Sequence, residues 1–260
     1  MLVTPTTDAM QVDDALDRLF ASGSSVWRRL QQDEPTYVAA YSAYTKASTE
    51  RDALPADKRC LLQLAIQASL TTLDPRGIED TMRAALAADA TPAEILHVLM
   101  LVSFCSVHSL TGGLAAAIGG LPADATALDR QEAQCGSDLV EQAHGDSGYW
   151  KSYDRVFPGF HERLAQLAPD LFIAYDDLGA ALWRPDGLAP VWCELVFVAM
   201  DLSSTHLYLD GARLHAANAV HYGATLDQIV AVVALSAAQG ARSIEVGAPI
   251  LWKLLEEANQ

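Results

Sequence analysis

The chain has 260 residues, of which 51% are apolar, and a formal net charge of −16 at pH 7. That length and apolar content permit a sizeable core, in one large domain or in two of ordinary size. Phosphate backbones and anionic lipids repel so acidic a chain, so we expect no nucleic-acid or membrane partner and expect a small-molecule substrate instead.

The N-terminal segment shows no targeting signal. Residues 1–20 lack the basic start and the long apolar stretch of a signal peptide. The longest nearly apolar run, residues 95–107, is too short to span a bilayer and contains His97. No two cysteines form a Cys-x-x-Cys pair, which excludes a zinc knuckle and a dithiol redox motif. We therefore expect a reduced, cytoplasmic protein.

One pattern occurs twice along the chain, at an offset of 134 residues, as from Leu30 to Leu164. Further matched pairs are Pro35 and Pro169, Tyr41 and Tyr175, Leu54 and Leu188, Thr91 and Thr225, Ile95 and Ile229, Val98 and Val232, and Leu101 and Leu235. Such an ordered series predicts a tandem duplication. The expected units are a first copy in residues 1–125, a connection in residues 126–146 and a second copy in residues 147–260.

Both copies are expected to be helical. Each contains a capping box, Thr91-Pro92-Ala93-Glu94 in the first copy and Thr225-Leu226-Asp227-Gln228 in the second, followed by apolar residues at helical spacing. In the second copy we predict two further helices over residues 188–203 and 204–221. No segment shows the alternation of a β-strand, so the predicted fold class is all-α, a tandem duplication of a helical bundle.

Two ionisable residues of the second copy are expected to meet between these helices. If the chain reverses at residues 203–205, Glu194 and His215 each lie about 15 Å from the turn along their helices. A carboxylate beside an imidazole orients the ring and stabilises its protonated form, which makes an acid/base unit. The alternative is a buried pair that only satisfies itself. The same geometry places Asp201 near Tyr208, closer to the turn.

Other side chains flank this pair. His206 lies near the expected start of the second helix, where the helix dipole would lower the pKa of a histidine. Trp183 and Arg184 precede the helix that carries Glu194. We expect these two residues either to close over a pocket or to remain at the surface.

The spacing of these residues carries a family resemblance. His215 stands eight residues before a Gly-Ala-Thr helix cap at residues 223–225. The supporting short motifs are Gly148-Tyr149-Trp150, Trp183-Arg184, Thr205-His206-Leu207-Tyr208 and the closing VGAPIL of residues 246–251. In this order they resemble the carboxymuconolactone decarboxylase/alkylhydroperoxidase superfamily, with Glu194 and His215 at its Glu and His positions. The resemblance is clear over about residues 148–256 and faint over about residues 26–120.

The resemblance implies an alkylhydroperoxidase D-like bundle that assembles into a homo-oligomer, a dimer or trimer of tandem chains. It implies a cofactor-independent lyase, specifically a decarboxylase of a small unsaturated or cyclic carboxylic acid of the lactone or keto acid type. No cofactor and no metal are implied. The implied site residues are Glu194, His215 and His206 for catalysis and Tyr208, Trp183, Arg184 and Asp201 for substrate binding.

The sequence also departs from the family pattern. Residues 206–209, His-Leu-Tyr-Leu, occupy the place of the thiol branch's Cys-x-x-Cys, so thiol-based peroxide chemistry is excluded. The interval from Glu194 to His215 is about two residues longer than in that branch. The first copy has Leu61 and Thr81 at the corresponding positions, which predicts a structural partner that lacks both polar groups.

Three alternatives remain open. The same acid/base pair would also serve isomerisation, cyclisation or hydrolysis of a related ring compound. The chain could instead be a non-catalytic binding protein derived from the enzyme fold. Finally, Glu194, His206 and His215 have the composition of a two-histidine, one-carboxylate metal site, although no outer group that would orient the histidines is evident.

Overall fold

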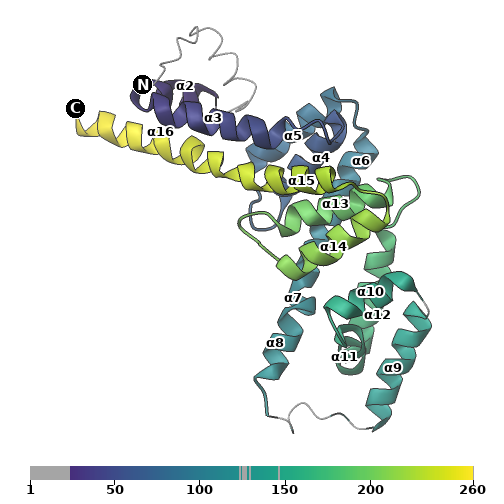
Figure 1. Ribbon diagram of the computed structural model, residues 1–260. Coiled ribbons are helices and arrows are strands. Elements are labelled where there is room, and N and C mark those ends of the chain that lie inside the picture. Colours follow the sequence, from purple (N-terminus) through teal and green to yellow (C-terminus); the bar gives the residue numbers. More distant parts are fainter. Residues whose placement is uncertain (1–23, 123, 125–127, 129, 146, 260) are drawn as a thin grey trace, which may run out of the picture.

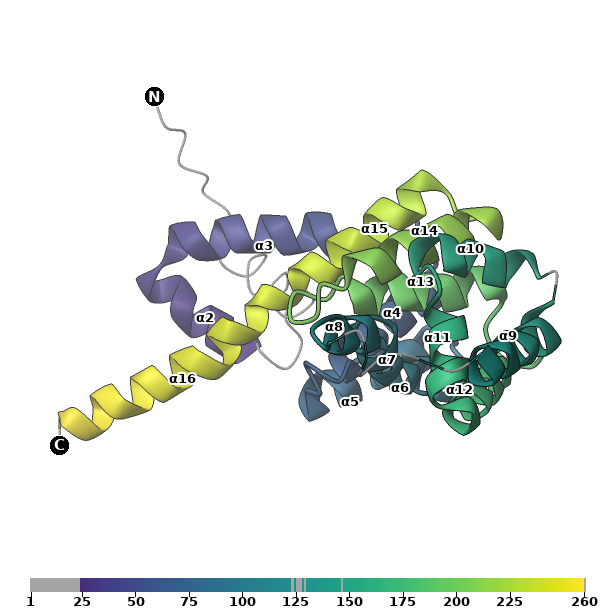
Figure 2. The ribbon, with the colours of Figure 1, turned by 90° about the horizontal axis from the view of Figure 1, so that it is seen from below.

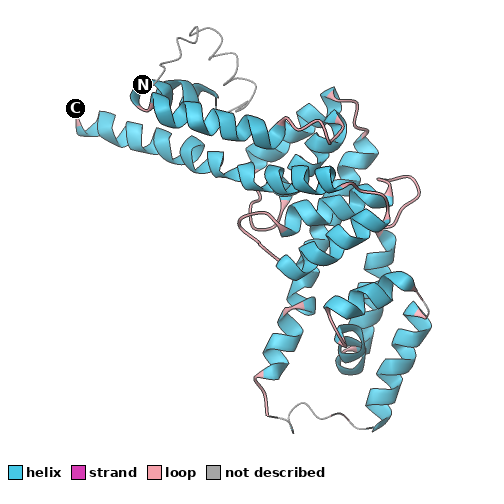
Figure 3. Cartoon of the chain, viewed as in Figure 1, coloured by secondary structure: helices cyan, strands magenta, loops and turns pink. Residues whose placement is uncertain are grey.

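The computed structural model describes residues 24–122, 124, 128, 130–145 and 147–259, and every regular element in them is a helix (Figures 1 and 3). The expected all-α class is confirmed. Part of the predicted first copy, residues 1–23, lies outside the described residues.

The helices lie before, within and after the predicted connection, which α9 occupies. Before it lie α2 (Ser24–Asp33), α3 (Pro35–Thr49), α4 (Ala56–Ala68), α5 (Pro75–Ala87), α6 (Pro92–Ser103), η2 (Phe104–Val107), α7 (His108–Thr111) and α8 (Gly113–Gly119). Within and after it lie α9 (Arg130–His144), α10 (Gly148–Val156), α11 (Phe160–Leu167), α12 (Pro169–Ala181), α13 (Pro190–Asp201), α14 (Leu209–His221), α15 (Leu226–Ala237), η4 (Ala238–Gly240) and α16 (Ala241–Ala258).

The centre of the molecule is built from α4, α5, α6, α13, α14 and α15 (Figure 1). Helix α4 packs against α5, α6 and α13, and α13 also packs against α14 and α15. Helix α13 is surrounded on all sides, because every residue from Cys193 to Asp201 is buried. A helix that is apolar all round suits such a position. The carboxylates of Glu194 and Asp201 are therefore the exceptions that need explanation.

Two smaller clusters flank this centre. On one side, α2 and α3 pack against α16 through Trp27, Val38 and Ile244. On the other side, α10, α11 and α12 pack against the segment from η2 to α8, with the rings of Phe104 and Tyr175 stacked 5.8 Å apart. Figures 1 and 2 both show α16 running outward beside α2 and α3, away from α8 and α9.

Both predicted capping boxes are present. The Thr91 hydroxyl accepts a hydrogen bond from the backbone N–H of Glu94, whose carboxylate accepts one from the backbone N–H of Thr91. Thr225 and Gln228 make the same two hydrogen bonds. Helices α6 and α15 therefore start at positions that the offset of the repeat relates.

A buried histidine ties the centre to the loop before α13. His97 Nε2 on α6 lies 2.7 Å from the carbonyl oxygen of Leu182, and the backbone N–H of Leu188 donates to His97 Nδ1 at 2.8 Å. These contacts require Nε2 to carry the proton and Nδ1 to accept. Gly187 packs directly on this ring, where an added Cβ would overlap the imidazole.

We predict that Gly187→Ala lowers the free energy of unfolding by about 1–3 kcal/mol, because the ring of His97 must move from both of its partners. Urea denaturation followed by circular dichroism measures the change. Gly247→Ala on α16 is the control, since a Cβ there meets no atom within 4 Å. If both variants unfold at the parent's urea concentration, the proposed packing at Gly187 is wrong.

Two continuous helical stretches, Pro92–Gly119 and Leu226–Ala258, are long and apolar enough to cross a membrane by length and composition. They are longer than the run of residues 95–107 because further helical turns continue α6 and α15. This is weak evidence, since core helices of soluble proteins pass the same test. Several charged groups in the second stretch are paired within the protein, as where Arg242 Nε lies 2.8 Å from Asp74 Oδ2.

Candidate active site

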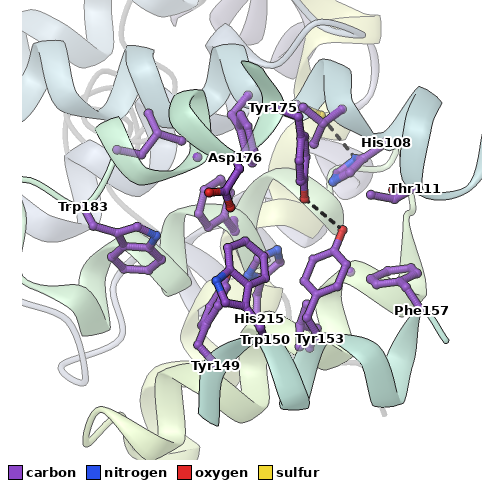
Figure 4. Close-up of a pocket in the computed structure, with 18 of the residues that line it drawn as sticks. His108, Thr111, Tyr149, Trp150, Tyr153, Phe157, Tyr175, Asp176, Trp183 and His215 are labelled. Atoms are coloured by element: carbon purple, nitrogen blue, oxygen red, sulfur yellow. Dashed lines mark hydrogen bonds between the residues drawn. The ribbon is translucent and has the colours of Figure 1, made fainter. Parts of the chain in front are cut away.

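A cavity of about 430 Å³ lies between the central helices and the α10–α12 cluster (Figure 4). Its walls come from η2 and α7, from α10 and α12, and from α13 and α14. The lining side chains with ionisable, thiol or hydroxyl groups are Cys105, His108, Thr111, Tyr149, Tyr153, Tyr175, Asp176, Tyr208, His215 and Tyr222. A cavity with largely apolar walls and a few placed polar groups is typical of a small-molecule site.

Glu194 and His215 form the predicted contact. His215 Nδ1 lies 2.7 Å from Glu194 Oε2, and the side-chain amide of Asn218 donates to Glu194 Oε1 at 3.3 Å. Glu194 on α13 has no exposed surface, whereas His215 on α14 lines the cavity. The carboxylate therefore holds the ring from the protein side, and Nε2 is the ring nitrogen that remains for a ligand. The longer interval between the two residues does not prevent their contact.

The surroundings of His215 favour its protonated form. Burial opposes a charged imidazolium, but the hydrogen bond that His215 donates to Glu194 and the charges of Glu194 and Asp201 outweigh burial and raise the pKa of His215 above its usual value. Phe197 stacks on the ring with 4.6 Å between centroids and restrains its plane. The geometry thus fits a general acid that offers a proton to a ligand in the cavity.

Aromatic side chains form the opposite wall. Trp150 and Tyr153 of α10 face the cavity (Figure 4). Behind them, the ring of His144 stacks on Trp150 at 4.0 Å, and His144 Nε2 lies 3.0 Å from Asp176 Oδ1. We singled out neither His144 nor Asp176 from the sequence. The motif Gly148-Tyr149-Trp150 was the only signal for this wall.

The segment that carries His206 and Tyr208 is a loop, which corrects one expectation. The helix expected over residues 204–221 begins only at Leu209, and the preceding turn contains Leu207 at a φ of 48°. The backbone N–H of Tyr208 donates to the carbonyl oxygen of Asp201 at 2.8 Å and closes this turn. Burial, rather than a helix dipole, lowers the pKa of His206.

The side chains of His206 and Tyr208 lie in different places. Tyr208 lines the cavity as expected, with its hydroxyl 2.9 Å from the Thr111 hydroxyl. His206 does not line the cavity, because its Nε2 faces His108 Nδ1 at 2.8 Å. The sequence-based metal trio is therefore not formed, since His215 pairs with Glu194 while His206 pairs with His108.

The three other residues expected to bind substrate differ in position. Trp183 lines the cavity, but Arg184 does not and pairs with Asp186 at 2.7 Å. Asp201 is fully buried and does not line the cavity. Burial, with the charge of Glu194, raises the pKa of Asp201 to about 7 against the opposing effect of His215. Helix α13 begins only at Pro190, so Arg184 lies in the loop before it. Asp201, the last residue of α13, is buried in the core rather than facing the cavity.

The first half of the chain, which we expected to be a structural partner without the acid/base pair, also contributes to this cavity. Cys105 of η2 and His108 at the start of α7 line the cavity, and Thr111 follows one turn later. The interval Cys-x-x-His was visible in the sequence, but its partners lie about 100 residues away. Only the packing of η2–α8 on the α10–α12 cluster brings them into the site.

Comparison with known proteins identifies one similar solved structure. It is the crystal structure of a Burkholderia xenovorans protein provisionally described as a gamma-carboxymuconolactone decarboxylase subunit, with a TM-score of 0.76 and 29% sequence identity. The match covers 98% of this chain and 100% of that chain. No protein-family model and no curated protein matches the sequence. The chain therefore has the carboxymuconolactone decarboxylase-like helical fold, which supports the resemblance to that superfamily.

Proposed function

We propose that this chain is a lyase of the carboxymuconolactone decarboxylase/alkylhydroperoxidase superfamily that decarboxylates a small unsaturated or cyclic acid of the lactone or keto acid type. One observation carries the proposal: the buried carboxylate of Glu194 holds the imidazole of His215 at the wall of an aromatic cavity. The description of the similar Burkholderia protein supports the same reaction class.

The proposed reaction needs no organic cofactor, because the substrate carries its own electron sink. As the bond to the carboxylate breaks and CO2 leaves, the electron pair moves into a conjugated carbonyl or lactone and forms an enolate. His215 Nε2 then delivers its proton to carbon, while Glu194 stabilises the imidazolium before transfer. The Tyr208 hydroxyl, which lines the cavity, would donate to the enolate oxygen. Apolar walls favour loss of the charged carboxylate by excluding water.

A tandem duplication would explain the arrangement of the helices. In this proposal α2–α6 corresponds to α11–α15, with proline in the first turn of both α3 and α12. A second cavity, of about 270 Å³, supports the correspondence. It is lined by Thr81 and Arg242, which the offset of the repeat relates to His215 and His108 of the larger cavity. The first copy would thus retain a cavity without the acid/base pair.

The reaction is tested with the full-length protein and a panel of γ-carboxymuconolactone, simpler unsaturated lactone acids and β-keto acids. We expect release of CO2 from one member, and in deuterium oxide one deuterium at the carbon that lost the carboxylate. Product formed without CO2 would favour an isomerase, cyclase or hydrolase. Tight binding of a panel member without any product would favour a binding protein.

We also propose that the chain forms a homo-oligomer through α16. In the apolar run of residues 95–107, Leu96 is exposed, but Ile95, His97, Val98, Leu101, Val102 and Cys105 are buried in the core. The large exposed apolar residues of α16 are Val246, Ile250, Leu251, Leu254 and Leu255, each 52–56% exposed. A patch of this kind on one helix is typical of an interface between proteins.

We predict that light scattering at micromolar concentration shows a dimer or trimer, and that the variant Leu251→Lys/Leu255→Lys shifts it to monomer because it places charges in the contact. Leu86→Lys, at an exposed site on α5, is the control and should keep the parent's mass. A parent of 27.9 kDa in solution would refute the proposed assembly.

A further inference from the structure

A second cluster of ligating side chains lies at the edge of the cavity, separate from the Glu194–His215 pair. Cys105 Sγ is 3.6 Å from His108 Nδ1 and 3.5 Å from His206 Nε2, and these two nitrogens are 2.8 Å apart. The three atoms come from η2, from the first residue of α7 and from the loop before α14. Segments about 100 residues apart in sequence thus converge on one point.

We propose that Cys105, His108 and His206 bind a divalent transition-metal ion, with zinc(II) as the best match to one thiolate and two imidazoles. A tetrahedral zinc ion, with bonds of about 2.0 Å to nitrogen and about 2.3 Å to sulfur, separates its ligand atoms by about 3.3–3.6 Å. Both sulfur–nitrogen distances already fall at this separation. The two nitrogens need to open by only about 0.5 Å to accept the ion.

A buried carboxylate next to His108 supports the assignment. Asp201 has no exposed surface, neither of its carboxylate oxygens has a hydrogen-bond partner among the described residues, and Oδ1 lies 3.6 Å from His108 Nε2. A carboxylate that receives the outer N–H of a metal-bound histidine is the usual arrangement at such sites. In the proposed site, Asp201 would hold the ring of His108 with its proton on Nε2 and its lone pair on Nδ1, toward the other two ligands.

The same tautomer argues against a simple pair of hydrogen-bonded histidines. With Nε2 of His108 directed to Asp201, the lone pair of Nδ1 converges with donor atoms of Cys105 and His206. One shared proton satisfies two of these three atoms, whereas one cation satisfies all three. Helical turns and a hydrogen-bonded loop hold the three side chains together before any ion binds, which lowers the free energy needed to organise them around an ion.

The fourth position of the ion would open to the cavity, since Cys105 and His108 both line it. A metal site with three protein ligands and one open position is the form found at catalytic centres, where water or a substrate oxygen completes the shell. This proposal replaces the expectation that the chain holds no metal. It does not rest on the decarboxylase proposal, because ion binding can be measured without substrate.

The test uses the full-length protein, reduced, stripped of metal with a chelator and titrated anaerobically with Co²⁺ and then Zn²⁺. We expect one Co²⁺ per chain, with the visible bands of a four-coordinate ion and the near-ultraviolet charge-transfer band of a thiolate ligand. Zn²⁺ should remove both features by displacement. A parent without the thiolate band, or without saturation near one ion per chain, would overturn the proposal whatever the variants show.

The variants identify the ligands. Cys105→Ser should abolish the charge-transfer band, and His206→Asn should weaken Co²⁺ binding at least 100-fold. Asp201→Asn should weaken it by about 10- to 100-fold, as expected for an outer carboxylate. Cys135→Ser and His221→Asn, both at exposed positions, are the matched controls and should bind as the parent does. Undiminished binding by folded Cys105→Ser and His206→Asn would show that the ion sits elsewhere.

Discussion

Glu194→Gln is expected to lower turnover of the acid that the parent decarboxylates by about 10²- to 10⁴-fold, the usual contribution of a placed general acid. The amide keeps the size of the side chain but removes its charge. Burial of His215 then acts without the charge of Glu194, so the pKa of His215 falls and less of the ring is protonated at neutral pH. A neutral ring cannot deliver the proton to carbon.

The pH profile separates this effect from a structural one. In the parent, the raised pKa of His215 keeps the acid form present to higher pH, so activity should decline only as pH rises through that value. In Glu194→Gln the decline should begin at lower pH, and activity should partly recover in acid. Glu141→Gln, at an exposed position on α9, is the control and should match the parent. A Glu194→Gln enzyme with the parent's rate and profile would remove the pair from the mechanism.

The local features of this fold follow from the sequence. The capping boxes at Thr91 and Thr225 could be recognised because the pattern is confined to four residues, and each starts a helix as expected. The meeting of Glu194 with His215 could also be predicted, since two antiparallel helices joined by one turn place residues at equal distance from that turn. Such arguments need only helical geometry and neighbouring elements.

What the sequence did not predict depends on contacts between distant elements. Cys105 and His108 enter the cavity because η2–α8 leaves the centre and packs on α10–α12, a choice that no local pattern dictates. His206 was misplaced because residues 202–208 contain a left-handed residue, Leu207, and form a loop rather than the first turns of α14. Arg184 was expected at the pocket but finds a nearer charge in Asp186, two residues away.

His215→Leu is expected to destabilise the protein more than the double variant Glu194→Met/His215→Leu. The single change leaves the fully buried carboxylate of Glu194 without its ionic partner, which is expected to lower the free energy of unfolding by about 3–5 kcal/mol. The double variant replaces both charges by apolar groups of similar volume inside an apolar helix pair, so its stability should return to or exceed that of the parent. The amide of Asn218 loses one acceptor, a smaller effect of about 1 kcal/mol.

Urea denaturation of the three proteins at several pH values tests the argument. A histidine whose folded pKa is raised stabilises the fold fully below its unfolded pKa of about 6.5 and loses that contribution as pH rises through the folded value. The free energy of unfolding of the parent, relative to that of the double variant, should therefore be highest near pH 6 and should fall toward pH 9. Equal losses in the single and double variants would show that Glu194 and His215 contribute through packing alone. In that case His215→Leu would lose no more stability than the double variant at any pH, because no unpaired buried charge would contribute to the loss.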